Sequence, residues 1–250
     1  VVASYQWAGQ DSVVVCDLSL LKDTVDLPFS FFLKDFQIIK LDNRDEAMVG
    51  ENNLCVSENY ILVYGSVYEL HPCRLFTKKG EFVTNIGAIG QGPGEYRAVY
   101  KAEIDEKHNC IYLMPFANSN AIYVYDLAGK PLRSIPLHQP VSKAVFKVDA
   151  DKRELTVGAL PFTGYPFVAW VQDVEGHLLD SVPAAKHLSV LPDYSNEVMY
   201  GANTEVFDLY ISTFFELRPD TLYHYIRSES RLKPRFTLNI GDRKRSITTF

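Results

Sequence analysis

The chain has 250 residues, of which 47% are hydrophobic and 13% aromatic, so it can bury a large core as one domain. Its 25 Lys and Arg residues against 31 Asp and Glu residues give a net charge of −6. The basic residues are scattered and form no face that would neutralise phosphates, which argues against a nucleic-acid partner. No run approaches the ~18 apolar residues that a transmembrane segment needs.

The first 50 residues are predicted to form an N-terminal extension that could supply a closing strand. The segment Val1–Gln10 lacks the pattern of a signal peptide, which is a basic stretch followed by an apolar one. A mature chain from which the signal peptide had been removed would look the same. Helical periodicity is confined to the short segment Leu18–Val25. The sequence therefore favours an all-β fold.

Three glycines in similar turns divide the rest of the chain. Gly80, Gly129 and Gly176 are separated by 49 and 47 residues, close to the ~40–50 residues of a four-stranded propeller blade. A fourth turn, Ser228–Arg231, takes the equivalent place without a glycine. Glycine suits a tight hairpin because it adopts positive φ without steric cost. Each turn is predicted to join the third and fourth strands of one blade.

The expected strands are Asn53–Ser57, Tyr60–Tyr64, Arg74–Thr77, Phe82–Ile86, Lys101–Asp105, Cys110–Met114, Ala121–Asp126, Pro131–Pro136, Val145–Val148, Leu155–Ala159, Phe167–Asp173, Leu178–Val182, Asn203–Phe207, Leu209–Thr213, Thr221–Ile226 and Arg235–Ile240. They predict one domain over residues 1–250, a β-propeller of four-stranded antiparallel blades, of which about four are readable. The alternative is a β-sandwich with long loops, although sandwiches usually space their turns at ~8–12 residues without a longer period.

Alternation within these strands predicts which side chains form the core. Five apolar residues are expected to be buried, namely Ile111, Leu113, Ile122, Val124 and Leu155. Tyr112 and Tyr123 are out of phase with them and are expected on the other face of their sheet.

Residues 86–96, Ile-Gly-Ala-Ile-Gly-Gln-Gly-Pro-Gly-Glu-Tyr, resemble the motif of a family of bacterial six-bladed β-propellers related to NHL-repeat and TolB-like propellers. Leu75-Phe76 and Gly80-Glu81-Phe82 are similar to the family's lead-in, and Phe36–Asp42 looks like its N-terminal strand. The resemblance covers about residues 13 to 241 and carries no catalytic residue over.

The resemblance implies a secreted or periplasmic protein, or a surface lipoprotein in its full-length form. Six blades need about two more than the four that are readable. Either the chain is incomplete at its C-terminus, or its propeller is smaller than the family's. No lipid-bearing N-terminal cysteine is present.

Propeller topology predicts where a ligand would bind, because inter-blade connections and the loops between second and third strands emerge at the same end of a blade. These segments are longer and richer in Tyr, Phe, Asn and Arg than the charged turns at the other end, which suits recognition. The candidate binding residues are Tyr68, His71, Gln91, Glu95, Tyr96, Arg97, Asn118, Tyr165 and Arg218. The alternative is that Gln91–Arg97 is a rigid turn between blades and that the aromatic residues pack blades together.

Other chemical motifs are missing from the sequence. The four cysteines, Cys16, Cys55, Cys73 and Cys110, have no metal-binding spacing and are expected to be reduced and buried. The six histidines form no paired motif, and Asp149-Ala150-Asp151 is typical of a charged hairpin turn rather than a calcium loop. No metal and no cofactor are predicted.

The sequence thus favours an extracytoplasmic binding module for a carbohydrate, a peptide or a partner protein. The alternative is a hydrolase or lyase that acts on a polysaccharide through carboxylates near the central channel. Glu95, Asp193 and Glu216 would be its candidate acids and bases.

Overall fold

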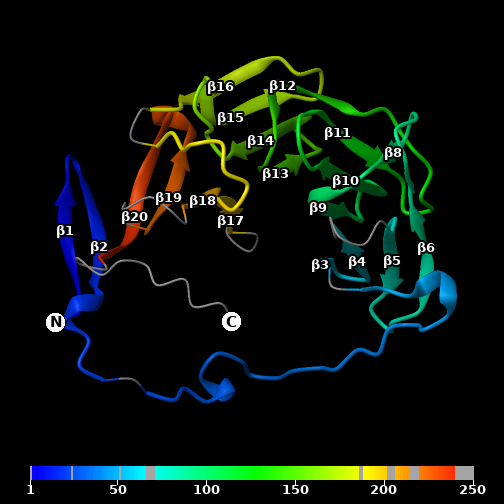
Figure 1. Ribbon diagram of the computed structural model, residues 1–250, viewed down its shortest axis with the longest axis horizontal. Helices are drawn as coiled ribbons and strands as arrows, with labels where there is room; N and C mark the ends of the chain where they lie inside the picture. Colours follow the sequence, from blue (N-terminus) through cyan, green and yellow to red (C-terminus); the bar gives the residue numbers. More distant parts are fainter. Residues whose placement is uncertain are drawn as a thin grey trace. The chain divides into compact units, whose positions relative to one another are not determined.

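A computed structural model describes residues 2–23, 25–50, 52–65, 71–185, 188–201, 206–213 and 220–239 (Figure 1). These residues form strands and four short 3₁₀ turns and contain no α-helix, which confirms the all-β fold. The turns are Leu18–Leu20, Phe29–Phe31, Asp45–Ala47 and Arg227–Glu229. Among the described residues, no helix has the length and apolar character needed to span a bilayer.

The chain divides into two compact units. Unit 1 contains Val1–Phe32, Thr156–Val171 and Leu179–Phe250, and unit 2 contains Leu33–Leu155 and Gln172–Leu178. The sheets of the protein are open, and most of their strands pair antiparallel with the next strand along the chain.

Two four-stranded sheets form most of unit 2. The first contains β3 (Asn53–Val56), β4 (Tyr60–Tyr64), β5 (Cys73–Thr77) and β6 (Phe82–Ile86) in sequence order. The second contains β9 (Val99–Asp105), β10 (Cys110–Pro115), β11 (Ser119–Tyr125) and β12 (Ile135–Val141), again in sequence order. Between them in the chain lies a short parallel pair, β7 (Ala88–Ile89) and β8 (Glu95–Tyr96).

The apolar faces of these two sheets share one core. Its buried residues are Leu62, Tyr64, Cys73, Leu75, Ile86, Tyr96, Val99, Ala102, Ile111, Leu113 and Tyr125. Face-to-face burial of alternating strand residues is the main stabilising contribution of such sheets. A smaller cluster on the other face of the first sheet joins Ile61, Val63 and Phe76 to Ala47.

A third four-stranded sheet contains β13 (Ala144–Asp149), β14 (Glu154–Ala159), β15 (Phe167–Asp173) and β16 (Leu178–Pro183). Its central strand β15 is covered on both faces, since five of its residues, Val168–Gln172, are buried.

The largest sheet lies in unit 1 and has six strands in the order β1-β2-β20-β19-β18-β17. The strands are β1 (Ala3–Ala8), β2 (Asp11–Asp17), β17 (Glu197–Tyr200), β18 (Asp208–Ser212), β19 (Asp220–Ile226) and β20 (Arg231–Asn239). β2 pairs with β20 in parallel, so an N-terminal strand joins the sheet beside the last described strand of the chain. The buried Asp11 carboxylate binds Arg231 at 2.5 Å and Lys233 at 3.3 Å across this junction.

The predicted turn glycines are confirmed. Gly80, Gly129 and Gly176 connect the third and fourth strands of three sheets and have φ values of +88°, +83° and +91°. In the turn between β19 and β20, Ser230 takes the left-handed conformation at φ +48°. The predicted burial is confirmed as well, since Ile111, Leu113, Ile122, Val124 and Leu155 are between 0% and 6% exposed. The predicted placement of Tyr112 and Tyr123 on the opposite face is wrong, because the register pairs Tyr112 with Val124 and Tyr123 with Leu113.

Three predicted strands are wrong in place or extent. Phe36–Asp42 is not a strand: Phe36 and Ile38 are exposed. The segment meets the first sheet through Ile39 and Leu41, which pack against the smaller cluster, and through the Asp42 amide, which donates to the Gly80 carbonyl at 2.8 Å. The outer strand placed at Pro131–Pro136 begins at Ile135, because Pro131 has no amide hydrogen to donate and forms only an isolated bridge.

Most of the predicted strand Asn203–Phe207 lies outside the described residues. The remaining correction concerns the six-stranded sheet, whose edge strand is Glu197–Tyr200. Its last strand begins at Arg231 instead of Arg235, since the ladder tolerates Pro234 through a register shift between Leu222 and Tyr223.

The turn geometry predicts that Gly129→Ala destabilises the protein more than Gly164→Ala does. Both residues have positive φ, so each substitution costs on the order of 1 kcal/mol in backbone strain. A Cβ atom at Gly129 would also lie 2.3 Å from the Asn85 carbonyl oxygen, whereas a Cβ atom at Gly164 meets nothing within 4 Å. Free energies of unfolding from urea titrations measure the difference, and equal losses would contradict this account.

Candidate functional site

The glycine-rich loop between β7 and β8 is closed on itself by Glu95. One oxygen of its carboxylate accepts a hydrogen bond from the Gly92 amide at 2.8 Å, and the Glu95 amide donates to the Gly92 carbonyl at 3.0 Å. A Cβ atom at Gly90 would lie 1.9 Å from the same carboxylate. Glu95 therefore shapes the loop, and within the described residues it forms no ion pair with the exposed Arg97.

Tyr96 also has a structural position, being only 4% exposed. Its hydroxyl donates a hydrogen bond to the Ile86 carbonyl and accepts one from the Cys73 amide at 2.7 Å. Its ring meets that of Tyr125 edge to face, with 6.4 Å between centroids. Tyr96 thus joins β5 and β6 to the start of the second sheet, and its hydroxyl is occupied inside the core.

We expect Tyr96→Phe to lower the free energy of unfolding by about 1–3 kcal/mol, because it leaves the buried Cys73 amide and Ile86 carbonyl without a partner. Tyr123→Phe is the matched control, since no described residue bonds the Tyr123 hydroxyl. Urea denaturation measures both variants, and a Tyr96→Phe protein as stable as the control would contradict the structural role.

Three connections of unit 2 meet at the end where β9 and β13 begin, which we call the loop end. The Phe116 amide donates to the Ala98 carbonyl at 3.0 Å, and the Ala117 amide donates to the Ser142 carbonyl at 3.0 Å. The loop between β10 and β11 therefore touches the segments that precede β9 and β13. This contact agrees with the topological argument that such segments emerge at one end of their sheets.

The loop end brings two aromatic rings beside a buried lysine. The Tyr100 and Phe116 rings are tilted against each other with 6.3 Å between centroids. The Lys143 ammonium lies 5.7 Å from the Tyr100 centroid and 5.9 Å from the Phe116 centroid, and the residue is only 3% exposed. Desolvated cation–π contacts of this kind stabilise a buried cation, and they fix its position.

The loop beside this cluster contains two successive residues in the left-handed region. Ala117 has φ +63° and Asn118 has φ +51°. Asparagine adopts this conformation readily, whereas alanine does so at a cost of roughly 1 kcal/mol. The strained pair presents the exposed Asn118 side chain at the loop end.

The other predicted binding residues are placed as follows. His71, Gln91 and Arg97 are exposed in unit 2. Tyr165 is half-buried in unit 1 and packs against Phe162, with 5.9 Å between ring centroids. Tyr68 and Arg218 lie outside the described residues.

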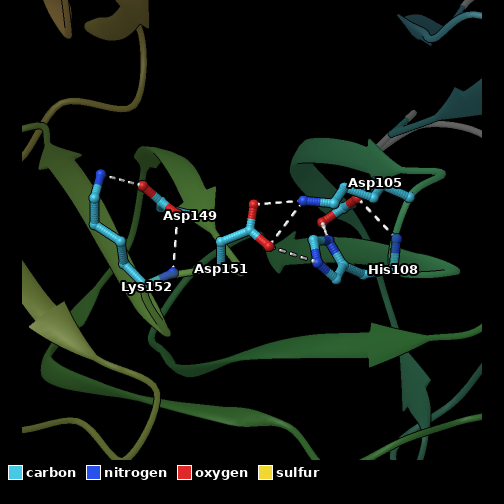
Figure 2. Close-up of polar contacts among 6 residues, drawn as sticks. Asp105, His108, Asp149, Asp151 and Lys152 are labelled. Atoms are coloured by element: carbon cyan, nitrogen blue, oxygen red, sulfur yellow. Dashed lines mark hydrogen bonds and ion pairs between the residues drawn. The ribbon is translucent and has the colours of Figure 1, made fainter.

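The strands of unit 2 end at an open groove of ≈ 480 Å³, at what we call the turn end. The turns after β3, β9 and β13 all line it. Figure 2 shows His108 between two carboxylates, 2.7 Å from Asp105 and 3.2 Å from Asp151. Asp151 also binds Lys107 at 2.5 Å, so the β9–β10 and β13–β14 turns are joined by charge pairs.

Glu103 lines the same groove and is the most perturbed carboxyl there. Burial raises its pKa to about 7, and this effect outweighs the hydrogen bond that it accepts from the Val148 amide at 3.1 Å and the nearby charge of Lys147. The neighbouring Asp151 behaves in the opposite way, because its hydrogen bond with Lys107 lowers its pKa. The groove therefore combines a carboxyl that is protonated near neutral pH with one that is ionised.

The raised pKa of Glu103 predicts that Glu103→Gln is more stable than the unsubstituted protein at pH 8, and that this gain is much smaller at pH 5. The folded state holds the proton more tightly than the unfolded chain, so the stability that this proton supplies is present at low pH and lost as the pH rises through about 7. Replacement by Gln should restore about 2 kcal/mol at pH 8 and little at pH 5. The exposed Glu58→Gln in the same groove is the control for urea titrations at both pH values. Equal effects of Glu103→Gln at pH 5 and pH 8 would contradict the prediction.

The structure describes two of the three carboxylates that the sequence suggested for catalysis. Glu95 bonds within its loop, Asp193 accepts a hydrogen bond from the Ser195 amide at 2.8 Å, and Glu216 lies outside the described residues. Asp149 binds Lys152 at 2.6 Å across the hairpin turn predicted there (Figure 2). In the described part of the chain, no three or more His, Cys, Asp or Glu residues are arranged to hold a metal ion. All four cysteines are free thiols, and only Cys73 is fully buried.

Sequence reasoning did not single out Tyr100, Lys143 or Glu103. Tyr100 and Lys143 are 43 positions apart, and no local motif connects them. Their position next to the first residues of β9 and β13, at the predicted loop end, is the signal that could have found them.

A family model described as a domain of unknown function, DUF4934, matches residues 13–249. No curated protein matches the chain. A protein of Bacteroides fragilis NCTC 9343 that is described as exported has a similar structure, with a TM-score of 0.56 and 20% identity over 82% of this chain and 56% of its own.

Two other solved structures are less similar. An auxiliary nutrient binding protein of Bacteroides thetaiotaomicron VPI-5482 has a TM-score of 0.44 and 13% identity over 72% of this chain and 40% of its own. The dihydro-heme d1 dehydrogenase NirN has a TM-score of 0.41 and 15% identity over 73% of this chain and 36% of its own. This chain thus spans about half, or less, of the length of these proteins.

Proposed function

The chain belongs to the DUF4934 family, and we propose that it is an extracytoplasmic binding module that takes its ligand at the loop end of unit 2. The ligand is a carbohydrate, a peptide or a partner protein. The location outside the cytoplasm rests on the exported Bacteroides fragilis protein of similar structure. Assignment to the six-bladed NHL- and TolB-like propellers, and attachment as a lipoprotein, belong to the same proposal.

One observation carries the proposal: the loop end holds Lys143 buried against the Tyr100 and Phe116 rings beside a strained loop. A buried cation between aromatic rings is costly to assemble, and backbone strain of this kind concentrates at binding sites. Exposed Asn118 and Arg97 lie on the segments that meet there and can direct hydrogen bonds to a ligand. His71 and Gln91 remain candidates on neighbouring loops.

This combination suits ligands that present both a flat apolar face and polar groups. Aromatic rings pack against sugar rings or apolar side chains, while an amide and a guanidinium fix orientation and specificity. Glu95 and Tyr96 support the site indirectly, because their hydrogen bonds hold the segment that leads to Arg97.

A glycan and peptide array should identify a ligand, and Arg97→Ala and Asn118→Gly should each weaken its binding about tenfold, or about 1.4 kcal/mol. Because glycine also adopts the left-handed backbone conformation, a loss of affinity in Asn118→Gly measures the contribution of the Asn118 side-chain amide. Lys79→Ala, an exposed cation on the β5–β6 turn, is the control. Titration calorimetry with the array ligand measures each variant. Unchanged affinity in both loop-end variants would refute the site.

A second candidate function is hydrolysis or elimination on a polysaccharide at the turn-end groove. It is favoured by the opposite pKa shifts of Glu103 and Asp151, because acid–base catalysis needs one protonated and one ionised group. A panel of polysaccharides assayed for new reducing ends tests it. Activity in the unsubstituted protein that Glu103→Gln abolishes would support the enzyme, and an inactive unsubstituted protein would leave the binding module as the function.

A further inference from the structure

A second cavity of unit 2 lies beside the glycine-rich loop and shares no residue with the loop-end cluster. It is a partly enclosed groove of ≈ 360 Å³. The lining residues are Gly92, Pro93, Gly94, Tyr123, Val124, Tyr125, Pro131, Leu132 and Ser134. The groove lies where β12 starts late: before Ile135 the returning chain pairs with β11 only through the isolated bridge between Tyr125 and Pro131 and through the Leu132 amide, which donates to the Val124 carbonyl at 2.8 Å.

The wall made by residues 92–94 is held in a fixed shape. The Glu95 carboxylate accepts a hydrogen bond from the Gly92 amide, and the Tyr125 hydroxyl donates to the Gly94 carbonyl at 2.9 Å. Gly94 has φ +75°, and a Cβ atom there would lie 3.1 Å from the Pro131 side chain, so the loop and the opposite wall are in close contact at this point. A wall that is already fixed in shape lowers the ordering cost of binding.

The groove offers polar groups without partners in the described structure. The hydroxyls of Tyr123 and Ser134, the Gly94 amide and the Pro93 carbonyl form no hydrogen bond with any described residue. Leu132, 42% exposed, supplies an apolar surface next to them. The groove thus pairs an aromatic and aliphatic surface with dispersed donors and acceptors.

The charge of the lining selects the class of ligand. None of the nine lining residues carries a formal charge, so the groove provides no oppositely charged partner for a phosphate, a carboxylate or an ammonium group. Proline-rich peptides dock between several exposed aromatic side chains, whereas here Tyr125 is fully buried and only Tyr123 is available. A neutral sugar ring fits better, because it has a flat C–H face and hydroxyls that both donate and accept.

We propose that this groove is a binding site for one neutral sugar ring of a saccharide. The ring packs against Tyr123 and Leu132, and its hydroxyls bond the Ser134 and Tyr123 hydroxyls and the exposed backbone of Pro93 and Gly94. The site is independent of the loop-end proposal, since neither needs the other for its geometry.

Cellobiose and maltose are the probes, measured by saturation-transfer NMR and by titration at millimolar concentrations. We expect at least one of them to bind, and Leu132→Glu to weaken it at least tenfold by placing a desolvated charge against the ring. Leu179→Glu on β16, a leucine of similar exposure at 46%, is the control and should change affinity less than twofold. Tyr123→Phe should weaken binding about threefold while leaving the melting temperature unchanged.

Three results would overturn the proposal: no binding of either disaccharide, binding that Leu132→Glu leaves unchanged, or selective binding of a proline-rich peptide at the groove. Arg97→Ala separates this test from the loop-end proposal, because that variant should leave disaccharide binding at the groove intact. Loss of disaccharide binding in Arg97→Ala, with Leu132→Glu unaffected, would assign the saccharide to the loop end instead.

Discussion

The buried hydroxyl of Tyr96 fixes the relation between the first two sheets of unit 2. It is bonded to β5 through the Cys73 amide and to β6 through the Ile86 carbonyl, while its backbone belongs to β8, immediately before β9. The hydroxyl both donates and accepts a hydrogen bond, so displacing the Tyr96 side chain would leave two buried backbone groups unpaired. The glycine-rich loop, the start of β9 and the loop end all depend on this position.

From that fixed point, the two ends of unit 2 differ in chemistry. At the loop end, long connections place aromatic rings around the buried Lys143. At the turn end, short hairpins place carboxylates, Lys107 and His108 around an open groove. The β-strands between them are rigid and apolar, which allows each end to vary without disturbing the core. A chain built in this way can carry a recognition surface at one end and a charged surface at the other.

Features set by local geometry were predictable from the sequence. The turn at Gly129 was predictable because glycine adopts positive φ without the steric cost that a Cβ atom brings. The burial of Ile111 and Leu113 followed from strand alternation. The strand at Phe36–Asp42 was wrong because its apolar pattern gives no information about a pairing partner, and Phe36 and Ile38 find none in the core. The Lys143 cluster and the raised pKa of Glu103 arise from contacts between strands distant in sequence, so no local pattern encodes them. The role of Tyr96 lay between these cases, since its motif was visible but its hydrogen-bond partners were not.

The parallel pairing of β2 with β20 has a consequence for biogenesis. Asp11 meets Arg231 across 220 residues of intervening chain, so the N-terminal strand cannot complete its sheet until nearly the whole described polypeptide has left the ribosome. Contacts of such long sequence separation carry a large loop-closure entropy and form late and slowly. Until then β2 has only the hairpin with β1 as a partner, and β1 exposes Tyr5 and Trp7 to solvent. During synthesis the chain therefore presents an open strand edge with aromatic side chains for as long as elongation lasts, and this edge is exposed to aggregation until β20 covers it.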